Sequence, residues 1–274
     1  MTADLLITIL AMLAAGLLAG FAAGIFGIGG GFVVVPALFL VLPLLGTAPN
    51  EIAHVAIGTS LATIVVTSIR SVQAHAKRGA VDFDMLKSWA PWIVLGVGAG
   101  VVLAARVPGG GLAIIFGGGM MIMAVHFLFP MFAGRQVAQA LPGGAAKVGI
   151  AGGLGAFSSL LGIGGGTIAI IVMTLCGKSI HRAIATASGI GFIIALPGVI
   201  GFSIIGWNMP GLPFGSLGYV NLPAAAAITA TSIFSAPWGA AAAHRLSPEM
   251  LRRIFGLYLV FVGAIMIRNG MHVL

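Results

Sequence analysis

Two glycine-rich blocks are the residues in this sequence best suited to hold a ligand. Both are written Gly-Ile-Gly-Gly-Gly, at residues 27–31 and 162–166. Glycine lowers helix stability, so each block should interrupt a helix and free backbone N–H groups. A helix that begins after such a break presents N–H donors and a positive dipole end, which attract anions. The predicted anion-binding glycines are Gly27, Gly29, Gly30, Gly31, Gly162, Gly164, Gly165 and Gly166.

Hydroxyl side chains near these blocks could serve the same anion. Ser60 and Ser188 each lie nine residues into a predicted membrane-spanning element, roughly 13 Å from its start. Thr59, Thr167 and Thr186 add hydroxyl donors nearby. The alternative is that these hydroxyls bond to carbonyls of their own helices, and the sequence leaves both interpretations open.

The ionisable residues argue against several other chemistries. The five acids all fall at element ends or in loops, so the sequence predicts no carboxylate at the membrane midplane for a metal or sodium ion. A serine protease using Ser188 would need a nucleophile elbow and a histidine at matching depth, and neither is found. The one histidine clearly inside a span, His126, and the single cysteine, Cys176, are best explained by packing. We therefore expect no enzyme activity, no catalytic residue, no metal and no cofactor.

Composition identifies the surroundings of these residues. Apolar residues make up 59% of the 274 residues and charged residues 7%, which is too apolar for a soluble protein of this size. The net charge of +8 has no contiguous basic patch with aromatics, so a nucleic-acid partner is not expected. The long uncharged stretches lack the alternation of barrel strands. The sequence predicts an all-α polytopic membrane protein in contact with lipid.

The chain contains an internal repeat. The glycine blocks recur 135 residues apart, and residues 97–117 align with residues 236–256 at a spacing of 139. Between them, residues 54–60 match residues 182–188 more weakly, which places Ser60 opposite Ser188. We predict a first repeat at 1–135 and a second at 136–274 within one membrane domain.

Each repeat divides into five apolar elements. The predicted ranges are 5–25, 31–45, 51–72, 86–105 and 110–132, then 145–161, 166–177, 180–206, 219–243 and 249–271. Asn50, Ser179 and Ser247 are the expected N-caps of the third, eighth and tenth elements. The arm at 167–177 would be roughly 17 Å long and is predicted to be a half-helix, whereas its partner at 32–45 could still cross fully.

Close helix packing is the competing explanation for the glycines. Small residues four apart let two helices approach, which accounts for Gly16 with Gly20 and for Gly96 with Gly100. A dense, duplicated block followed by a short arm favours the ligand-binding explanation instead. Irregular backbone at membrane depth is tolerated where it lines a cavity.

An odd number of elements per repeat predicts that the halves are inverted, as in many secondary transporters. The positive-inside rule gives the orientation. With both termini outside, 11 of the 13 basic residues lie inside, and only Arg106 and Arg268 lie outside. Arg70, Arg182 and Arg245 could recruit anions at the inner mouth or act only as topology determinants. The segment Met1–Asp4 lacks a positive n-region, so the first apolar run is expected in the mature protein.

The paired glycine blocks, the Gly58-Thr59-Ser60 triplet and the Arg-Val-Pro and Arg-Leu-Ser loops before Phe-Gly resemble the sulfite exporter TauE/SafE family, also called TSUP. The resemblance covers nearly the whole chain and implies a permease of the bacterial inner membrane. It implies a small anionic substrate such as sulfite, thiosulfate or a sulfonate, exported by alternating access. Another small organic anion as substrate, and an anion channel, are the alternatives. The second repeat has Thr186-Ala187-Ser188 instead of Gly-Thr-Ser, and the oligomeric state is left open.

Overall fold

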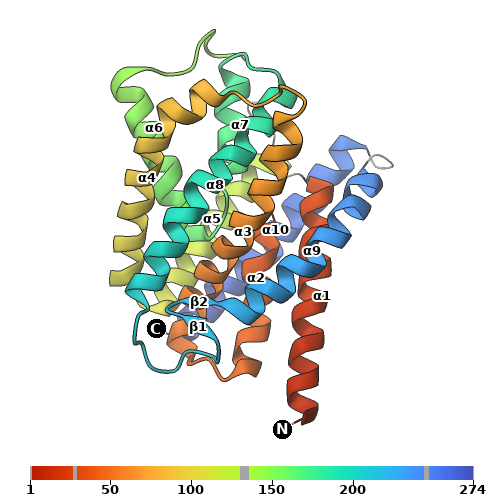
Figure 1. The fold of residues 1–274 in the computed structure, drawn as a ribbon, viewed down its shortest axis with the longest axis vertical. Coiled ribbons are helices and arrows are strands. Elements are labelled where there is room, and N and C mark those ends of the chain that lie inside the picture. The colour runs from red at the N-terminus through yellow and green to blue at the C-terminus, as the bar shows by residue number, and fades with distance from the viewer. Residues whose placement is uncertain (1, 27–29, 130–135, 244–246, 274) are drawn as a thin grey trace.

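In the described part of the chain, ten helices run back and forth along one axis (Figure 1). The computed structural model describes the backbone of residues 2–26, 30–129, 136–243 and 247–273. The first half holds α1 (Thr2–Phe26), α2 (Gly31–Val41), α3 (Ile52–Ala76), α4 (Phe83–Arg106) and α5 (Gly109–Leu128). The second half holds α6 (Gly144–Leu161), α7 (Gly166–Leu175), α8 (Ile180–Ile205), α9 (Leu222–Ala243) and α10 (Pro248–Val273). All ten predicted elements are present.

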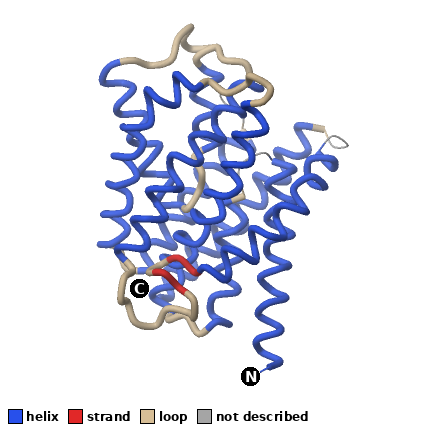
Figure 2. The backbone as a smooth tube through the Cα atoms, in the orientation of Figure 1, coloured by secondary structure: helices blue, strands red, loops and turns tan. Residues whose placement is uncertain are grey.

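Loops, two 3₁₀ turns and a short β-hairpin connect the helices in the described part of the chain (Figure 2). Two 3₁₀ turns, Leu42–Leu45 and Pro49–Glu51, connect α2 to α3. A hairpin of β1 (Ser216–Leu217) and β2 (Val220–Asn221) precedes α9 and was not predicted. Because each of these two strands has only two residues and most of the described chain is helical, the prediction of an all-α fold is confirmed.

Helix caps follow local sequence in most places. Ser179 Oγ accepts from Arg182 N at 3.4 Å, and Ser247 Oγ accepts from Met250 N at 3.2 Å, so both predicted caps are confirmed. The prediction for Asn50 is wrong, because this residue lies inside the 3₁₀ turn and Glu51 precedes α3 without a side-chain cap. Pro49 favours that extra turn, which delays the start of the α-helix.

Six helices among the described residues are long and apolar enough to cross a membrane: α3, α4, α5, α6, α8 and α10. α2 and α7 have 11 and 10 residues, or roughly 15–17 Å each, which is too short for a bilayer core of about 30 Å. Large apolar side chains such as Leu18, Leu103 and Phe261 point outward, where lipid would cover them.

Both termini lie at the same end of the molecule (Figure 1). The pair α1 and α2 enters from that end, whereas α6 and α7 enter from the opposite end, where α3 meets α4 and α7 meets α8. We call the end with the termini the terminal end and the other the basic end, because Lys77, Arg78, Lys178 and Arg182 flank helix ends there.

The main helix pairs are α1 with α9, α4 with α6, α5 with α10 and α3 with α8. Glycines permit the first two contacts. A Cβ atom on Gly16 would meet Thr231, and one on Gly96 would meet the backbone of Gly152. The close-packing explanation for these glycines is therefore confirmed.

Candidate functional site

The two glycine breaks meet inside the bundle. Gly30 and Gly165 are the N-caps of α2 and α7, and both have left-handed backbones, with φ of 77° and 64°. A Cβ atom on Gly31 would lie 2.7 Å from the carbonyl oxygen of Gly162 and 3.0 Å from Ile163 Cα. The N-terminus of α2 thus rests against the backbone of the second break. Gly27 and Gly29 lie outside the described residues.

Polar groups at the second break lack partners. Neither α2 nor α7 has a side-chain cap at its N-terminus. The hydroxyls of Ser158 and Thr167 are buried and make no hydrogen bond within the described part of the chain. A Cβ atom on Gly165 would lie 2.9 Å from Ser158 Oγ. These groups could donate to an oxyanion, since the first N–H groups of a helix have no partner within the helix.

A cavity of about 590 Å³ opens at the breaks. Gly30, Gly164 and Gly166 form part of its wall, and so does Ser188 on α8. The rest of the wall comes from α1, α2, α3, α8 and α9. On α3 its polar lining residues are Thr63, Thr67, Ser68, Arg70, Ser71 and His75. These lie in the half of α3 nearer the basic end, so the cavity extends from the breaks toward that end.

The predicted hydroxyl residues divide into two groups. Ser188 lines the cavity and donates to Ala185 O at 2.7 Å, and Ser60 is buried and donates to Gly162 O at 2.8 Å. Thr59 and Thr186 are fully buried away from the cavity lining. Their hydroxyls accept the backbone N–H groups of Asn221 and Asp82, each at 2.9 Å. These two threonines therefore anchor the segments that start α9 and α4.

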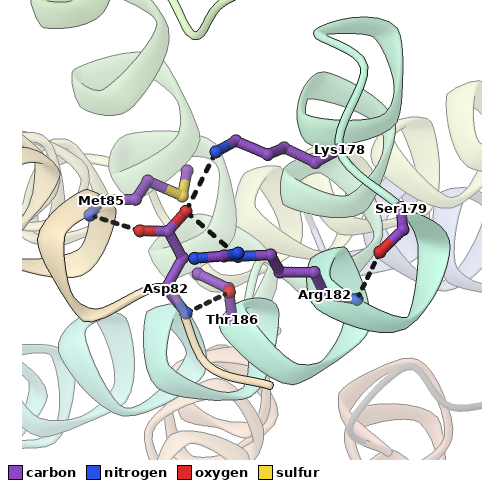
Figure 3. A network of polar contacts seen from close by, with 6 residues as sticks. All are labelled: Asp82, Met85, Lys178, Ser179, Arg182 and Thr186. Atoms are coloured by element: carbon purple, nitrogen blue, oxygen red, sulfur yellow. Dashed lines mark hydrogen bonds and ion pairs between the residues drawn. The ribbon is translucent and has the colours of Figure 1, made fainter. Parts of the chain in front are cut away.

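Asp82 joins the two halves at the basic end (Figure 3). Its Oδ1 accepts from Met85 N at 3.1 Å and caps α4, while Oδ2 lies 3.2 Å from Lys178 Nζ and 3.4 Å from Arg182 Nε. Burial raises the pKa of the Asp82 carboxyl, but the Met85 N–H and the two cations outweigh it, so the pKa lies below its ordinary value. Asp82 is thus ionised at neutral pH and holds α4 against the start of α8.

An aromatic contact packs α3 against the hairpin near the terminal end. The ring of His54 stacks on Tyr219 with centroids 4.7 Å apart, and His54 Nε2 lies 3.0 Å from Ala104 O. Burial and the neighbouring Glu51 carboxylate raise the pKa of Tyr219. α3, α4 and the hairpin before α9 are therefore packed together where the cavity does not reach.

No set of three or more His, Cys, Asp or Glu side chains within the described ranges is placed to hold a metal ion. The cavity lining is mostly apolar, and its polar side chains are hydroxyls, Arg70 and His75. This donor set suits an anion better than a cation.

Comparison with known proteins identifies the family of this chain. The family model described as "Sulfite exporter TauE/SafE" matches residues 12–266. The chain belongs to this family. It is 36% identical over 256 residues to a "Probable membrane transporter protein" of Haemophilus influenzae, covering 93% of this chain and 96% of that protein. It is 26% identical to the "Probable membrane transporter protein YunE" of Bacillus subtilis, covering 93% of this chain and 96% of that one. No solved structure is significantly similar.

The predicted family resemblance is thus confirmed, and the chain is a multi-pass membrane transporter of the TauE/SafE family. Sequence reasoning named Arg70 but missed the other polar cavity residues of α3, and it also missed the role of Asp82. The Asp82-Phe83-Asp84-Met85 segment carried a usable signal for the latter, because an aspartate before an apolar helix is a common N-cap. The unpartnered Ser158 had no distinguishing signal in the sequence.

Proposed function

We propose that this transporter carries small sulfur-containing oxyanions, such as sulfite, thiosulfate or sulfonates, and that it exports them. The observation that most supports this proposal is that the two glycine breaks are in contact at the base of the cavity. The cavity lining includes Arg70 and several hydroxyls, and no acidic residue is among its lining residues. Backbone N–H groups, hydroxyls and a guanidinium are the donors that bind sulfur oxyanions. The binding residues in this proposal are Gly27, Gly29, Gly30, Gly31, Ser60, Gly162, Gly164, Gly165, Gly166, Thr167 and Ser188, with Thr59 and Thr186 as positioning residues.

The transport mechanism in this proposal is alternating access by two inverted repeats, 1–135 and 136–274. The helix pairing supports it, because exchanging the halves turns the α1–α9 pair into α6–α4 and maps α5–α10 and α3–α8 onto themselves. The re-entry of α1–α2 and α6–α7 from opposite ends is the arrangement expected of inverted repeats (Figure 1).

The proposed orientation places the basic end in the cytoplasm of a bacterial cell and both termini outside the inner membrane. The positive-inside rule supports it. The cavity then opens to the cytoplasm. An anion leaving an inside-negative cell gains about 2.3 kcal/mol per charge per 100 mV, so export needs no coupled ion.

Ligand-dependent thermal stability of the purified protein tests the substrate class. A ligand at 100 times its dissociation constant stabilises the folded state by about 2.7 kcal/mol. Sulfite, thiosulfate or sulfoacetate should raise the unfolding temperature, and chloride or acetate at equal ionic strength should not. Equal shifts with all anions, or a shift with acetate alone, would contradict the proposal.

A matched pair of variants locates the binding. Gly165→Ala and Gly144→Ala both place alanine at positive φ, but a Cβ atom at position 144 has nothing within 4 Å. The backbone penalty is therefore similar, about 1–2 kcal/mol. Gly165→Ala should lose the oxyanion-dependent shift and Gly144→Ala should keep it.

A further inference from the structure

The cavity opens toward one end only, and the fold indicates where its counterpart is hidden. We infer that a second access route, closed in this structure, runs from the glycine breaks to the terminal end between α8 on one side and α4 with α6 on the other. This inference rests on the proposed alternating access of two inverted repeats, and it assigns residues to the state that is not seen here.

Three structural matches fix which residues correspond between the halves. Gly30 and Gly165, 135 residues apart, are both left-handed N-caps. Asp82 and Asn221, 139 apart, start α4 and α9, and each side chain accepts from the N–H group three residues later. The backbone N–H of each also donates to a threonine on the opposite half, Thr186 or Thr59, which are 127 apart.

These matches revise one alignment detail. The weaker sequence match places Ser60 opposite Ser188, a spacing of 128, whereas the shared hydrogen bond places α3 opposite α8 at a spacing of 127. Burial supports the second spacing. At 127, Ser68 corresponds to the buried Ala195, whereas at 128 it would correspond to Leu196, which is exposed.

On α8, the counterparts of the cavity face of α3 form a closed surface. Thr63, Thr67, Ser68, Ser71 and His75 line the cavity. Their counterparts are Ile190, Ile194, Ala195, Gly198 and Phe202, and all five are buried. Thr63 and Ser68 are themselves only 4% and 7% exposed, but they border the cavity, whereas Ile190, Ile194 and Ala195 are 0% exposed. The helical face that borders the cavity on α3 is therefore packed on α8.

The same contrast holds on the facing helices. Ser232 and Ala236 of α9 line the cavity, Ser232 with 8% of its surface exposed, whereas their counterparts on α4, Ile93 and Val97, are only 0% and 1% exposed. α4 packs along α8 as far as Val101, whose side chain a Cβ atom on Gly201 would meet at 2.8 Å. α9 instead stands away from α3 in the region of the cavity. Exchanging these two arrangements would open a route beside α4 and close the cavity beside α9.

Two residues belong to both routes. Ile64 and Gly191 both line the cavity and are each other's counterparts at the spacing of 127. A Cβ atom on Gly164 would lie 3.3 Å from Ile64 and 3.4 Å from Gly191. The axis that relates the halves therefore passes beside the glycine break, so that an anion bound there would face either route in turn.

The buried hydroxyl of Ser158 gives independent support. This hydroxyl has no hydrogen-bond partner among the residues that the structure describes. Ser158 and Ile194 both lie close to the position that a Cβ atom on Gly165 would occupy. A buried polar group without a partner is costly. Ser158 would gain water or substrate as a partner once α8 separates from α4 and α6.

The two routes differ in charge. Arg70 and His75 line the open cavity, and their counterparts on α8 are Pro197 and Phe202. An anion would therefore be attracted by Arg70 in the open cavity, and the matching position on α8, Pro197, carries no charge. The basic residues of the terminal end, Arg106 and Arg268, lie instead near the ends of α4 and α10.

Cysteine accessibility tests the route. The chain has one native cysteine, the buried Cys176, so Cys176→Ser gives a background without thiols. In it, Ser68→Cys probes the open cavity, Ala195→Cys probes its counterpart, and Ala124→Cys, buried on α5, is the control away from both. A membrane-impermeant maleimide is added from each side of oriented vesicles, and modification is followed by mass spectrometry.

Ser68→Cys should react from the cytoplasmic side and Ala195→Cys from the opposite side. Minor states of two-state proteins are commonly populated at about 0.1–10%, so Ala195→Cys should react more slowly than Ser68→Cys but at least about tenfold faster than Ala124→Cys. In the double variant, a bulky adduct at position 68 should slow the reaction at position 195 at least about tenfold, because it holds the open cavity apart.

A reaction at position 195 no faster than at position 124 would overturn the inference, as would equal reactivity with and without the adduct. Neither readout depends on which anion is carried. If labelling alternates but sulfur oxyanions fail to stabilise the protein, the route stands and the proposed substrate class fails.

Discussion

Replacing Gly31 with alanine should separate the two glycine breaks. The added methyl group would lie 2.7 Å from the Gly162 carbonyl oxygen, and that oxygen also accepts the Ser60 hydroxyl at 2.8 Å. The two atoms nearest to this methyl group, the Gly162 carbonyl oxygen and Ile163 Cα at 3.0 Å, belong to the backbone, so neither can rotate away. Gly166 is the matched control, because it is the equivalent first residue of α7 and a Cβ atom there has nothing within 4 Å.

The expected size of the effect follows from these contacts. Gly→Ala at a compatible position stabilises a protein by about 0.4–1 kcal/mol through the unfolded chain, and both variants share this gain. Overpacking costs about 1–3 kcal/mol and applies to Gly31→Ala alone. The two variants should therefore differ by about 1–3 kcal/mol, or roughly 2–12 °C in unfolding temperature.

The assay is thermal unfolding of both variants in one detergent at one scan rate, followed by intrinsic tryptophan fluorescence. Oxyanion-dependent stabilisation is measured in the same experiment. Gly31→Ala should unfold at a lower temperature than Gly166→Ala. It should also bind sulfite more weakly than the unaltered protein does. Equal unfolding temperatures for the two variants would refute the contact between the breaks.

Four further outcomes follow from the structure. Asp82→Asn should cost less than about 1 kcal/mol of unfolding free energy, because Lys178 and Arg182 are partly exposed and asparagine can still cap α4. Asp82→Ala also removes the cap and should cost about 1 kcal/mol more. The lowered pKa of Asp82 predicts that its stabilisation is complete at neutral pH and is lost as pH falls below the ordinary value of 3.8, so Asp82→Asn should flatten the acid limb of the stability curve. Thr59→Val and Thr186→Val each leave a buried backbone N–H without its acceptor and should each cost about 1–3 kcal/mol in thermal unfolding. Arg70→Gln should slow uptake of a labelled oxyanion from the basic end at least about twofold at low ionic strength, and added salt should remove the difference.

The fold was largely predictable because its main determinants are local in the sequence. Every predicted element is found within four residues of its expected limits, since apolar runs, glycines and prolines mark membrane helices directly. The half-helix α7 followed from its length alone. The case of α2 remained open, because the distinction between its α-helical part and the 3₁₀ turn at Leu42–Leu45 depends on local geometry.

The candidate site was predictable only in part. The glycine blocks identified both breaks, but nothing in the sequence indicated that Gly31 would contact Gly162, since this depends on how the halves pack. Thr59 and Thr186 were grouped with Ser60 and Ser188 because their depth is the same. Helix rotation separates them, directing the two threonines toward backbone N–H groups of the other half and Ser188 toward the cavity.

Counterflow in proteoliposomes directly tests whether the protein exchanges sulfur oxyanions by alternating access. Vesicles are loaded with unlabelled sulfite, thiosulfate or sulfoacetate, with acetate and chloride as controls, and uptake of labelled sulfite is followed. Alternating access predicts that labelled sulfite accumulates transiently above its equilibrium level when sulfur oxyanions are inside the vesicles. This accumulation should be lost in Gly165→Ala and kept in Gly144→Ala. Labelled sulfite that only equilibrates, whatever the internal anion, would show conduction without alternating access and would contradict the account.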